Sequence, residues 1–261
     1  MLEGRARDAE PVGFSTLWLG QTFDYDALGL AGLLGRATQR ISLGTWLVPS
    51  PTRHPMALGQ AALTAQAACG GRLRLGIGVS HRAVLGNRFG IDFPSPVKHM
   101  RATLEVLDPL LCGRRVDRKG PVWTAQGGLQ IPAAVRPELL LAALQPGMLA
   151  LAGQASDGAA LWLASLKHLQ EAAVPIVSEA AARAGRCAQL PSYRAVLRLG
   201  GASGPEDVAL IGNESELADR LGLLAEAGVD ELNALVVPEA GVGGSVPRTT
   251  EFLSERALAT D

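Results

Sequence analysis

The sequence predicts an α/β fold whose strands run parallel in one sheet. Its short apolar runs are nearly continuous, not alternating, which is typical of strands covered on both faces. The segments between these runs have the period of amphipathic helices. Successive runs lie about 25–35 residues apart, a spacing that suits right-handed βαβ units. The predicted strands are Leu17–Gly20, Ile41–Val48, Leu73–Val79, Leu139–Leu144, Ala159–Ala164 and Leu232–Val237.

Helices are predicted between these runs. Residues 95–113 carry apolar side chains at steps of three and four, namely Val97, Met100, Leu104, Leu107 and Leu111. A second helix is expected from Asn213, with Glu216 three residues on in the pattern of a capping box, to Gly228. The N-terminal residues 1–14 are predicted to form part of an amphipathic helix. Alternating strands and helices indicate α/β architecture.

Two arrangements of such units are possible, a closed (β/α)8 barrel and an open doubly wound sheet. No GxGxxG follows the first predicted strand, and the sequence has no P-loop. Both motifs are typical of open nucleotide-binding sheets. Their absence favours the barrel, in which the loops after the strands form the active face.

Composition excludes several classes of protein. Hydrophobic residues make up 48% and charged residues 19% of the 261 residues, and the formal net charge is −1. This is a globular composition, with no electrostatic case for binding nucleic acid or an anionic membrane surface. No transmembrane segment or signal peptide is expected. The cysteines, Cys69, Cys112 and Cys187, are far apart and without metal-ligand spacing, so we expect free thiols, a cytoplasmic setting and no metal.

Residues 113–138 interrupt the alternation. They are rich in glycine and proline and have no helical period, so they are interpreted as a non-helical insertion, formed as a hairpin, ahead of the strand at 139–144. A second glycine-rich loop, 239–248, follows the last predicted strand.

Polar residues follow the predicted strands. Gln21, Asp24 and Asp26 follow the first, His54 and its neighbours the second, and Ser80, His81 and Arg82 the third. The fourth is followed by "QPGM", which opens a helix. The sequence has no nucleophile elbow and no zinc-protease motif. The carboxyl ends of parallel strands meet at one edge, so these groups are candidates for a common site.

At these residues the chain resembles a known family. "RHPMALGQAALTAQAACGGRLRLGIGVSHR", "FSTLWLGQTFDYDAL" and "LLLAALQPGMLALAGQASDGAALW" are similar to segments of the luciferase-like monooxygenase superfamily. "QLPSYRA" is similar to a segment of its bacterial branch that depends on coenzyme F-420, an 8-hydroxy-5-deazaflavin. The resemblance extends from about residue 4 to residue 237.

The resemblance implies a single TIM-type barrel domain over 1–261 that holds a flat ring at the carboxyl ends of its strands. It implies a non-proline cis peptide at the positions of Leu47, Val48 and Pro49, and an anion site at the helix that begins within Gln145–Met148. The implied cofactor-binding residues are Thr45, Val48, Pro49, Gly76, Gly78, Ser80, Pro146, Gly147 and Met148. His54 and His81 are candidate proton donors or ring contacts, and Gln21 is a candidate orienting group.

Each candidate also has a purely structural interpretation. Gly76 and Gly78 would let a ring lie against the strand end, or simply end a strand in a turn. His54 precedes Pro55 and could belong to a helix cap. Asp26 is predicted to cap a helix. His99 and His168 are expected on helix surfaces. Trp46 and Trp162 are expected to pack within strands, although either could line a pocket.

The chain departs from the family pattern in ways that predict an incomplete barrel. Relative to the family pattern we expect the first strand to be missing, because residue 1 already falls at the first helix, and about one later strand to be missing before "QLPSYRA". Residues 207–212 could form a weak further strand. The turn Gln145–Pro146–Gly147 lacks the family's basic residue, which weakens the expected phosphate contact.

Three functions follow as hypotheses. The first is an oxidoreductase that transfers a hydride between coenzyme F-420 and a small organic substrate. The second is an FMN-dependent monooxygenase on the same fold. The third is a catalytically silent, truncated barrel that binds a ligand or partner. Family analogy further suggests a homodimer.

Overall fold

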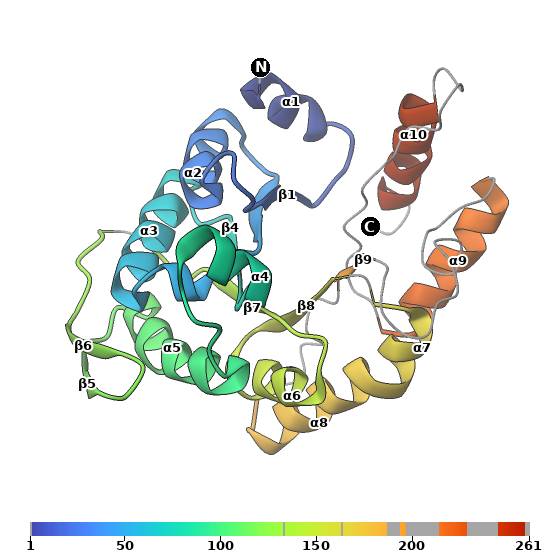
Figure 1. Ribbon diagram of the computed structural model, residues 1–261. Coiled ribbons are helices and arrows are strands. Elements are labelled where there is room, and N and C mark those ends of the chain that lie inside the picture. Colours follow the sequence, from blue (N-terminus) through green and yellow to red (C-terminus); the bar gives the residue numbers. More distant parts are fainter. Residues whose placement is uncertain are drawn as a thin grey trace.

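The computed structural model describes residues 2–132, 134–162, 164–186, 194–196, 214–228 and 245–258. Its main sheet is parallel and curled, with the strand order β1-β2-β4-β7-β8-β9 and with β3 beside β4 (Figure 1). The strands are β1 (Thr16–Gly20), β2 (Ser42–Trp46), β3 (Val48–Pro49), β4 (Leu73–Gly78), β7 (Glu138–Ala142), β8 (Gly158–Trp162) and β9 (Arg194–Val196). The described strands thus form an incomplete barrel.

Helices, chiefly those from α2 to α8, cover the outer face of this sheet, and α9 and α10 lie apart from it (Figure 1). The long ones are α1 (Leu2–Ala9), α2 (Ala27–Ala37), α3 (Pro55–Ala68), α5 (Pro96–Leu111), α6 (Pro146–Ala155), α8 (Val174–Arg183), α9 (Glu214–Glu226) and α10 (Ser245–Leu258). Single turns are η1 (Ser50–Thr52), α4 (Arg82–Val84), η2 (Leu85–Phe89), α7 (Leu166–His168) and η3 (Leu169–Ala173). In the described part of the chain, no helix is long and apolar enough to cross a membrane.

Alternate residues of each strand face the helices or the inside of the curl. The helix-facing residues belong to the main core, including Leu43, Leu75, Ile77, Leu139, Leu141, Ala159 and Leu161. The inward-facing residues form a separate small cluster of Trp46, Leu140 and Ala160, against which Trp18 and Leu47 pack. Because both faces are buried, the strands have the continuous apolar character seen in the sequence.

Five of the six predicted strands are confirmed, although Ile41–Val48 is divided into β2 and β3. Strand β9, which pairs in parallel with β8, was not among the predicted strands. The structure also confirms the helices at 97–111 and 214–226 and the N-terminal helix. Gly228, which has φ 85°, follows the second of these helices as its predicted terminus. Leu232–Val237, residues 207–212 and Asn213 lie outside the described residues.

The insertion at 113–138 contains the predicted hairpin. Strands β5 (Val116–Lys119) and β6 (Thr124–Gly127) pair in antiparallel fashion and pack on α5 through Val116 and Ala125. The Trp123 ring lies edge-on to His99, with 5.5 Å between ring centroids, and its Nε1 donates to Thr103 Oγ1 at 2.9 Å. The hairpin is therefore fastened to the outer face of α5.

The expectation that His99 lies on a helix surface is wrong. Only 5% of this residue is exposed, because the hairpin and η1 cover that part of α5. Its Nε2 is 3.2 Å from the hydroxyl oxygen of the buried Ser50. Burial lowers the pKa of His99, since burial disfavours the charged imidazolium. His168 is half-buried on α7.

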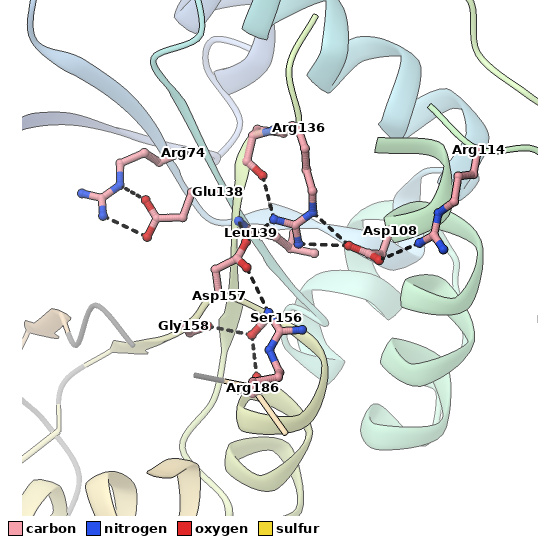
Figure 2. A network of polar contacts seen from close by, with 12 residues as sticks. Arg74, Asp108, Arg114, Arg136, Glu138, Leu139, Ser156, Asp157, Gly158 and Arg186 are labelled. Atoms are coloured by element: carbon pink, nitrogen blue, oxygen red, sulfur yellow. Dashed lines mark hydrogen bonds and ion pairs between the residues drawn. The ribbon is translucent and has the colours of Figure 1, made fainter. Parts of the chain in front are cut away.

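A network of charges joins the amino ends of β7 and β8 to two helices (Figure 2). Arg136 donates to Asp108 of α5 at 2.9 and 3.1 Å and to Asp157 at 2.5 Å. Asp157 also accepts from Arg186, beyond α8, at 3.0 Å and from the backbone N–H of Leu139 at 2.8 Å. This network lies at the edge opposite to the one where an active site is expected, so we interpret it as stabilising.

Helix α1 is held against the α2–β2 turn by Glu10. Its Oε1 accepts from the backbone N–H groups of Gln39, Arg40 and Ile41 at 2.8, 2.6 and 3.0 Å. Burial acts to raise the pKa of Glu10, but these hydrogen bonds and the charge of Arg40 lower it by more. The pKa therefore lies below its ordinary value.

We expect Glu10→Gln to lower the free energy of unfolding by about 1 kcal/mol at pH 7, a modest value because water screens this site. A carboxyl group with a lowered folded pKa stabilises the fold above its unfolded pKa, near ~4.3, and loses that contribution as pH falls through the folded value. The difference between variant and wild type should therefore be smaller in acid, below the folded pKa, than at pH 7. Urea unfolding at both pH values measures it, with Asp8→Asn on α1 as the control. An equal difference at both pH values would contradict the proposed clamp.

Candidate functional site

The carboxyl ends of the parallel strands meet at one edge, and the segments that follow them carry the predicted site. The site segments are 21–26 after β1, 48–54 around β3, 79–93 after β4, and 143–148 after β7. In barrels of parallel strands this edge is the active face. Among the described residues, no group of three or more His, Cys, Asp or Glu side chains gathers where it could hold a metal ion.

A non-proline cis peptide joins Trp46 to Leu47 at the junction of β2 and β3. The family resemblance implied such a bond within Leu47–Pro49, and the structure has it at the first of these residues. Strand β4 pairs with β2 at Leu43 and Gly44. Further along, it pairs with β3, starting at Val48. The sheet edge is thus irregular at this point.

Thr45 bridges the irregular stretch. Its hydroxyl donates to the carbonyl oxygen of Gly76 and accepts from the backbone N–H of the same residue, both at 2.9 Å. Thr45 is completely buried. Its side chain therefore replaces ladder hydrogen bonds between β2 and β4, and its predicted cofactor contact stays a prediction.

Gly76 and Gly78 are required by close packing within the sheet. A Cβ atom on Gly76 would lie 2.2 Å from the carbonyl oxygen of Thr45, and one on Gly78 would lie 2.8 Å from the Cβ of Ala142. Leu47 also lies against both positions. Neighbouring protein atoms thus explain both glycines, independently of any ligand.

Three neighbouring strands carry small side chains at adjacent inward positions near the carboxyl edge, and β8 then ends in the larger Trp162 on the same face. Ala142 of β7 pairs with Ala160 of β8, and Gly78 of β4 lies against Ala142. Two residues earlier along β4, Gly76 pairs with the larger Leu140. The three positions Gly78, Ala142 and Ala160 carry no long side chain, and Trp46 and Leu47 pack in the same inward cluster as Ala160. We call these three positions the small-residue row.

Ser80 and His81 follow β4 directly. Ser80 has φ 63°, in the left-handed region that non-glycine residues seldom adopt. His81 is exposed and precedes α4, and its side chain makes no capping hydrogen bond. Its ring is therefore available for contact with a ligand at this edge.

His54 is held in place by structural contacts. Its Nδ1 accepts from the backbone N–H of Met56 at 3.2 Å, which caps α3. Its Nε2 is 3.1 Å from the carbonyl oxygen of Thr124 on the hairpin, and its ring lies edge-on to Trp123. An Nε2–H tautomer satisfies both contacts. The geometry favours the helix-cap interpretation, and the role of proton donor stays a prediction.

Gln21 and Asp26 shape the segment after β1. Gln21 Oε1 accepts from the backbone N–H of Ala27 at 2.9 Å, and Asp26 Oδ1 accepts from that of Gly29 at 2.8 Å. The predicted cap at Asp26 is confirmed. Burial acts to raise the pKa of Asp26, but hydrogen bonds from Arg53 and Gly29 lower it by more, so the carboxylate is favoured.

Helix α6 begins at Pro146, as predicted, and its N-terminal end faces outward. Pro146 and Gly147 are exposed, whereas Met148 is buried and its backbone N–H donates to the Gln145 carbonyl at 3.0 Å. Gln145 makes no side-chain cap. This end has the dipole that favours an anion, but without the family's basic residue.

An aromatic and cationic group near the same edge was missed by sequence reasoning. Phe23 after β1 lies against Phe89 after β4, with 6.3 Å between ring centroids, and Arg88 lies over Phe23 at 4.7 Å. The amino-acid composition of these segments was the feature of the sequence that could have identified this group. Only five phenylalanines occur in the chain, and three of them, Phe23, Phe89 and Phe93, fall in the two segments after β1 and β4.

Comparison with known sequences finds oxidoreductases whose sequences are similar to this chain. A Mycobacterium tuberculosis protein provisionally named as a coenzyme F-420-dependent oxidoreductase is 31% identical over 169 residues, which are 59% of this chain and 48% of that protein. The 5,10-methylenetetrahydromethanopterin reductase of Methanolobus tindarius is 27% identical over 182 residues, 69% of this chain and 55% of the reductase. The chain spans about half the length of the curated relatives it matches.

Comparison with solved structures supports the barrel architecture. The coenzyme F-420-dependent tetrahydromethanopterin reductase from Methanopyrus kandleri superposes with a TM-score of 0.80 at 19% identity, covering 99% of this chain and 94% of that one. At this identity the likeness concerns the fold, which is therefore of the TIM type. A family model described as luciferase-like monooxygenase matches residues 2–199, well over half of the sequence. The chain belongs to the luciferase-like monooxygenase family.

Proposed function

We propose that this protein is an oxidoreductase that transfers a hydride between coenzyme F-420 and a small organic substrate. The observation that carries the proposal is the small-residue row, Gly78–Ala142–Ala160, at the edge where this family's barrels are expected to hold a ring. The names of the two sequence relatives, both at 27% identity or more, point to the same cofactor or to a pterin-linked reduction.

The proposal assigns a role to each part of the edge. The small-residue row would lie under the ring, and the N-terminal end of α6 would receive an anionic group of the cofactor. When bound, a deazaflavin supplies two-electron hydride chemistry. The protein itself binds, orients and excludes water. His81, which is exposed and lies three residues after Gly78, is the leading candidate for a proton donor, because an imidazole nitrogen can carry and donate a proton.

The test is a fluorescence titration of the purified protein with oxidised coenzyme F-420, with FMN in parallel. We expect saturable binding of the deazaflavin. Ala142→Leu should weaken it by about tenfold or more, because the longer side chain would occupy the position of the ring. Ala57→Leu, an exposed position on α3, is the control and should bind as wild type does.

Three outcomes of the titration would change or overturn the proposal. Binding of FMN in preference to F-420 would replace the proposal by an FMN-dependent monooxygenase. A folded protein that binds neither, as judged by circular dichroism, would overturn both and favour a barrel that binds another ligand or a partner. Unchanged F-420 binding in Ala142→Leu would show that the ring does not lie on the small-residue row.

A further inference from the structure

Exposed aromatic side chains gather at the carboxyl edge of the sheet. Phe23 and Tyr25 after β1 are each 59% exposed, Phe89 after β4 is 46% exposed, and Trp162 at the end of β8 is 43% exposed. In the described chain, the other large exposed apolar residues are aliphatic, namely Leu33, Val122, Val135 and Leu223. Exposed apolar groups that cluster mark binding surfaces more often than scattered ones do.

The segments after β1 and β4 form one surface, which we call the aromatic patch and define as Phe23, Phe89, Phe93, Arg82 and Arg88. The Phe23 and Phe89 rings are 6.3 Å apart and tilted by 32°. Arg88 lies over Phe23 at 4.7 Å from the ring centroid, and Arg82 lies over Phe93 at 5.0 Å. Ring and guanidinium planes are therefore presented together.

The charges of the patch are available to a ligand. Neither Arg82 nor Arg88 forms an ion pair with a carboxylate of the described residues, whereas Arg53 nearby is paired with Asp26. Two other carboxylates belong to these segments. Asp24 accepts a hydrogen bond from the Thr22 hydroxyl at 2.7 Å, and Asp92 is exposed. The guanidinium groups stacked on rings are thus the groups best placed to meet a flat anion.

The patch adjoins the expected position of the cofactor. The small-residue row runs from β4 through β7 to β8, and the expected anion site on α6 follows β7. The aromatic patch follows β1 and β4, so it meets the row at β4 and extends from there toward the β1 end of the strand order. A ring on the row would therefore have one neighbouring surface for a second flat molecule.

We propose that the aromatic patch binds the substrate, and that the substrate is a flat aromatic or conjugated acid. Its ring contacts Phe23 and Phe89, and its carboxylate contacts Arg88 or Arg82. The inference rests on the proposed function, because it takes the cofactor to lie on the small-residue row.

The experiment is a calorimetric titration with three probes, on protein saturated with F-420 and on protein without it. The probes are trans-cinnamate, its neutral amide, and cyclohexanecarboxylate, which has the charge without the flat ring. Cinnamate should bind about fivefold more tightly than either other probe. Phe89→Leu and Arg88→Gln should each weaken cinnamate binding by about fivefold. The matched controls, Leu223→Ala on α9 and Arg36→Gln on α2, should leave it unchanged.

The same variants are titrated with F-420, which separates the two proposals. Unchanged F-420 affinity with weakened cinnamate binding supports the substrate role. Equal loss of F-420 affinity would assign the arginines to the cofactor and overturn the inference. Cinnamate that binds no better than cyclohexanecarboxylate, or equally well to all variants, would also overturn it. If F-420 fails to bind wild-type protein, the proposed function fails, and the titration without cofactor still decides whether the patch recognises a flat acid.

Discussion

Replacing Asp157 with alanine is expected to lower the free energy of unfolding by about 3 kcal/mol. Asp157 accepts hydrogen bonds from Arg136, Arg186 and the backbone N–H of Leu139 (Figure 2). Without Asp157, the partly buried guanidinium of Arg136 keeps only one carboxylate partner, Asp108. The backbone N–H of Leu139 then has lost its acceptor. The side chains of Arg136 and Asp157 are about a quarter exposed, so the loss stays below that for a fully buried pair.

The same carboxylates compensate the charge of Arg136. Burial acts to lower the pKa of Arg136, but the hydrogen bonds and charges of Asp157 and Asp108 raise it by more. The guanidinium thus remains charged in the fold, and loss of either carboxylate leaves that charge less well compensated.

Denaturant unfolding at pH 7 measures the effect. Asp157→Asn should lose less than Asp157→Ala, because its amide oxygen can still accept from Leu139. Asp219→Ala, an exposed position on α9, is the control and should change the free energy of unfolding by less than about 0.5 kcal/mol. Equal stabilities of Asp157→Ala and the control would show that the network contributes nothing measurable.

Replacing Gly153 with alanine is expected to lower the free energy of unfolding by about 2 kcal/mol. Gly153 lies where α6 crosses α8. A Cβ atom there would be 2.3 Å from the carbonyl oxygen of Val177, 2.9 Å from the Cβ of Ala180 and 3.0 Å from the backbone nitrogen of Ala181. Two of these atoms belong to the backbone, so a side-chain rotation cannot relieve the clash and the helices must separate.

Gly222→Ala should change the free energy of unfolding in the opposite direction. Gly222 lies within α9, and a Cβ atom added there would meet no described atom within 4 Å outside its own helix backbone and chain neighbours. Alanine there should raise the free energy of unfolding by about 0.5–1 kcal/mol, because alanine has the higher helix propensity. Thermal and denaturant unfolding of both variants measures the contrast. A stabilising Gly153→Ala would contradict the close approach of α6 and α8.

The sequence predicted those features that depend on neighbours along the chain. Continuous apolar runs predicted strands, and the period of residues 97–111 predicted α5. Asp26 was predicted as a cap because an aspartate directly precedes the helical segment, and in the structure its side chain bonds a backbone group three residues on. The glycine and proline content of 113–138 predicted the hairpin, although not the helix on which it packs.

The candidate site was predicted in its location and less well in the roles of its residues. Thr45 and Gly76 were expected to meet a cofactor, yet they bond to each other across 31 positions of sequence. His54 bonds to Thr124, which is 70 positions away. His99 was expected at the surface and is buried, because the hairpin folds back over α5. The aromatic patch depends on the contact of Phe23 with Phe89.

The sequence by itself determined the α/β architecture, the order of strands and helices, and the family, since periodicity and local motifs encode them within short windows. Only the tertiary structure decided which polar groups are already bonded, which glycines are crowded, and which aromatic residues share a surface. The physical reason is that burial and hydrogen bonding depend on residues distant in sequence, whose approach is set by how the whole sheet curls and its helices pack.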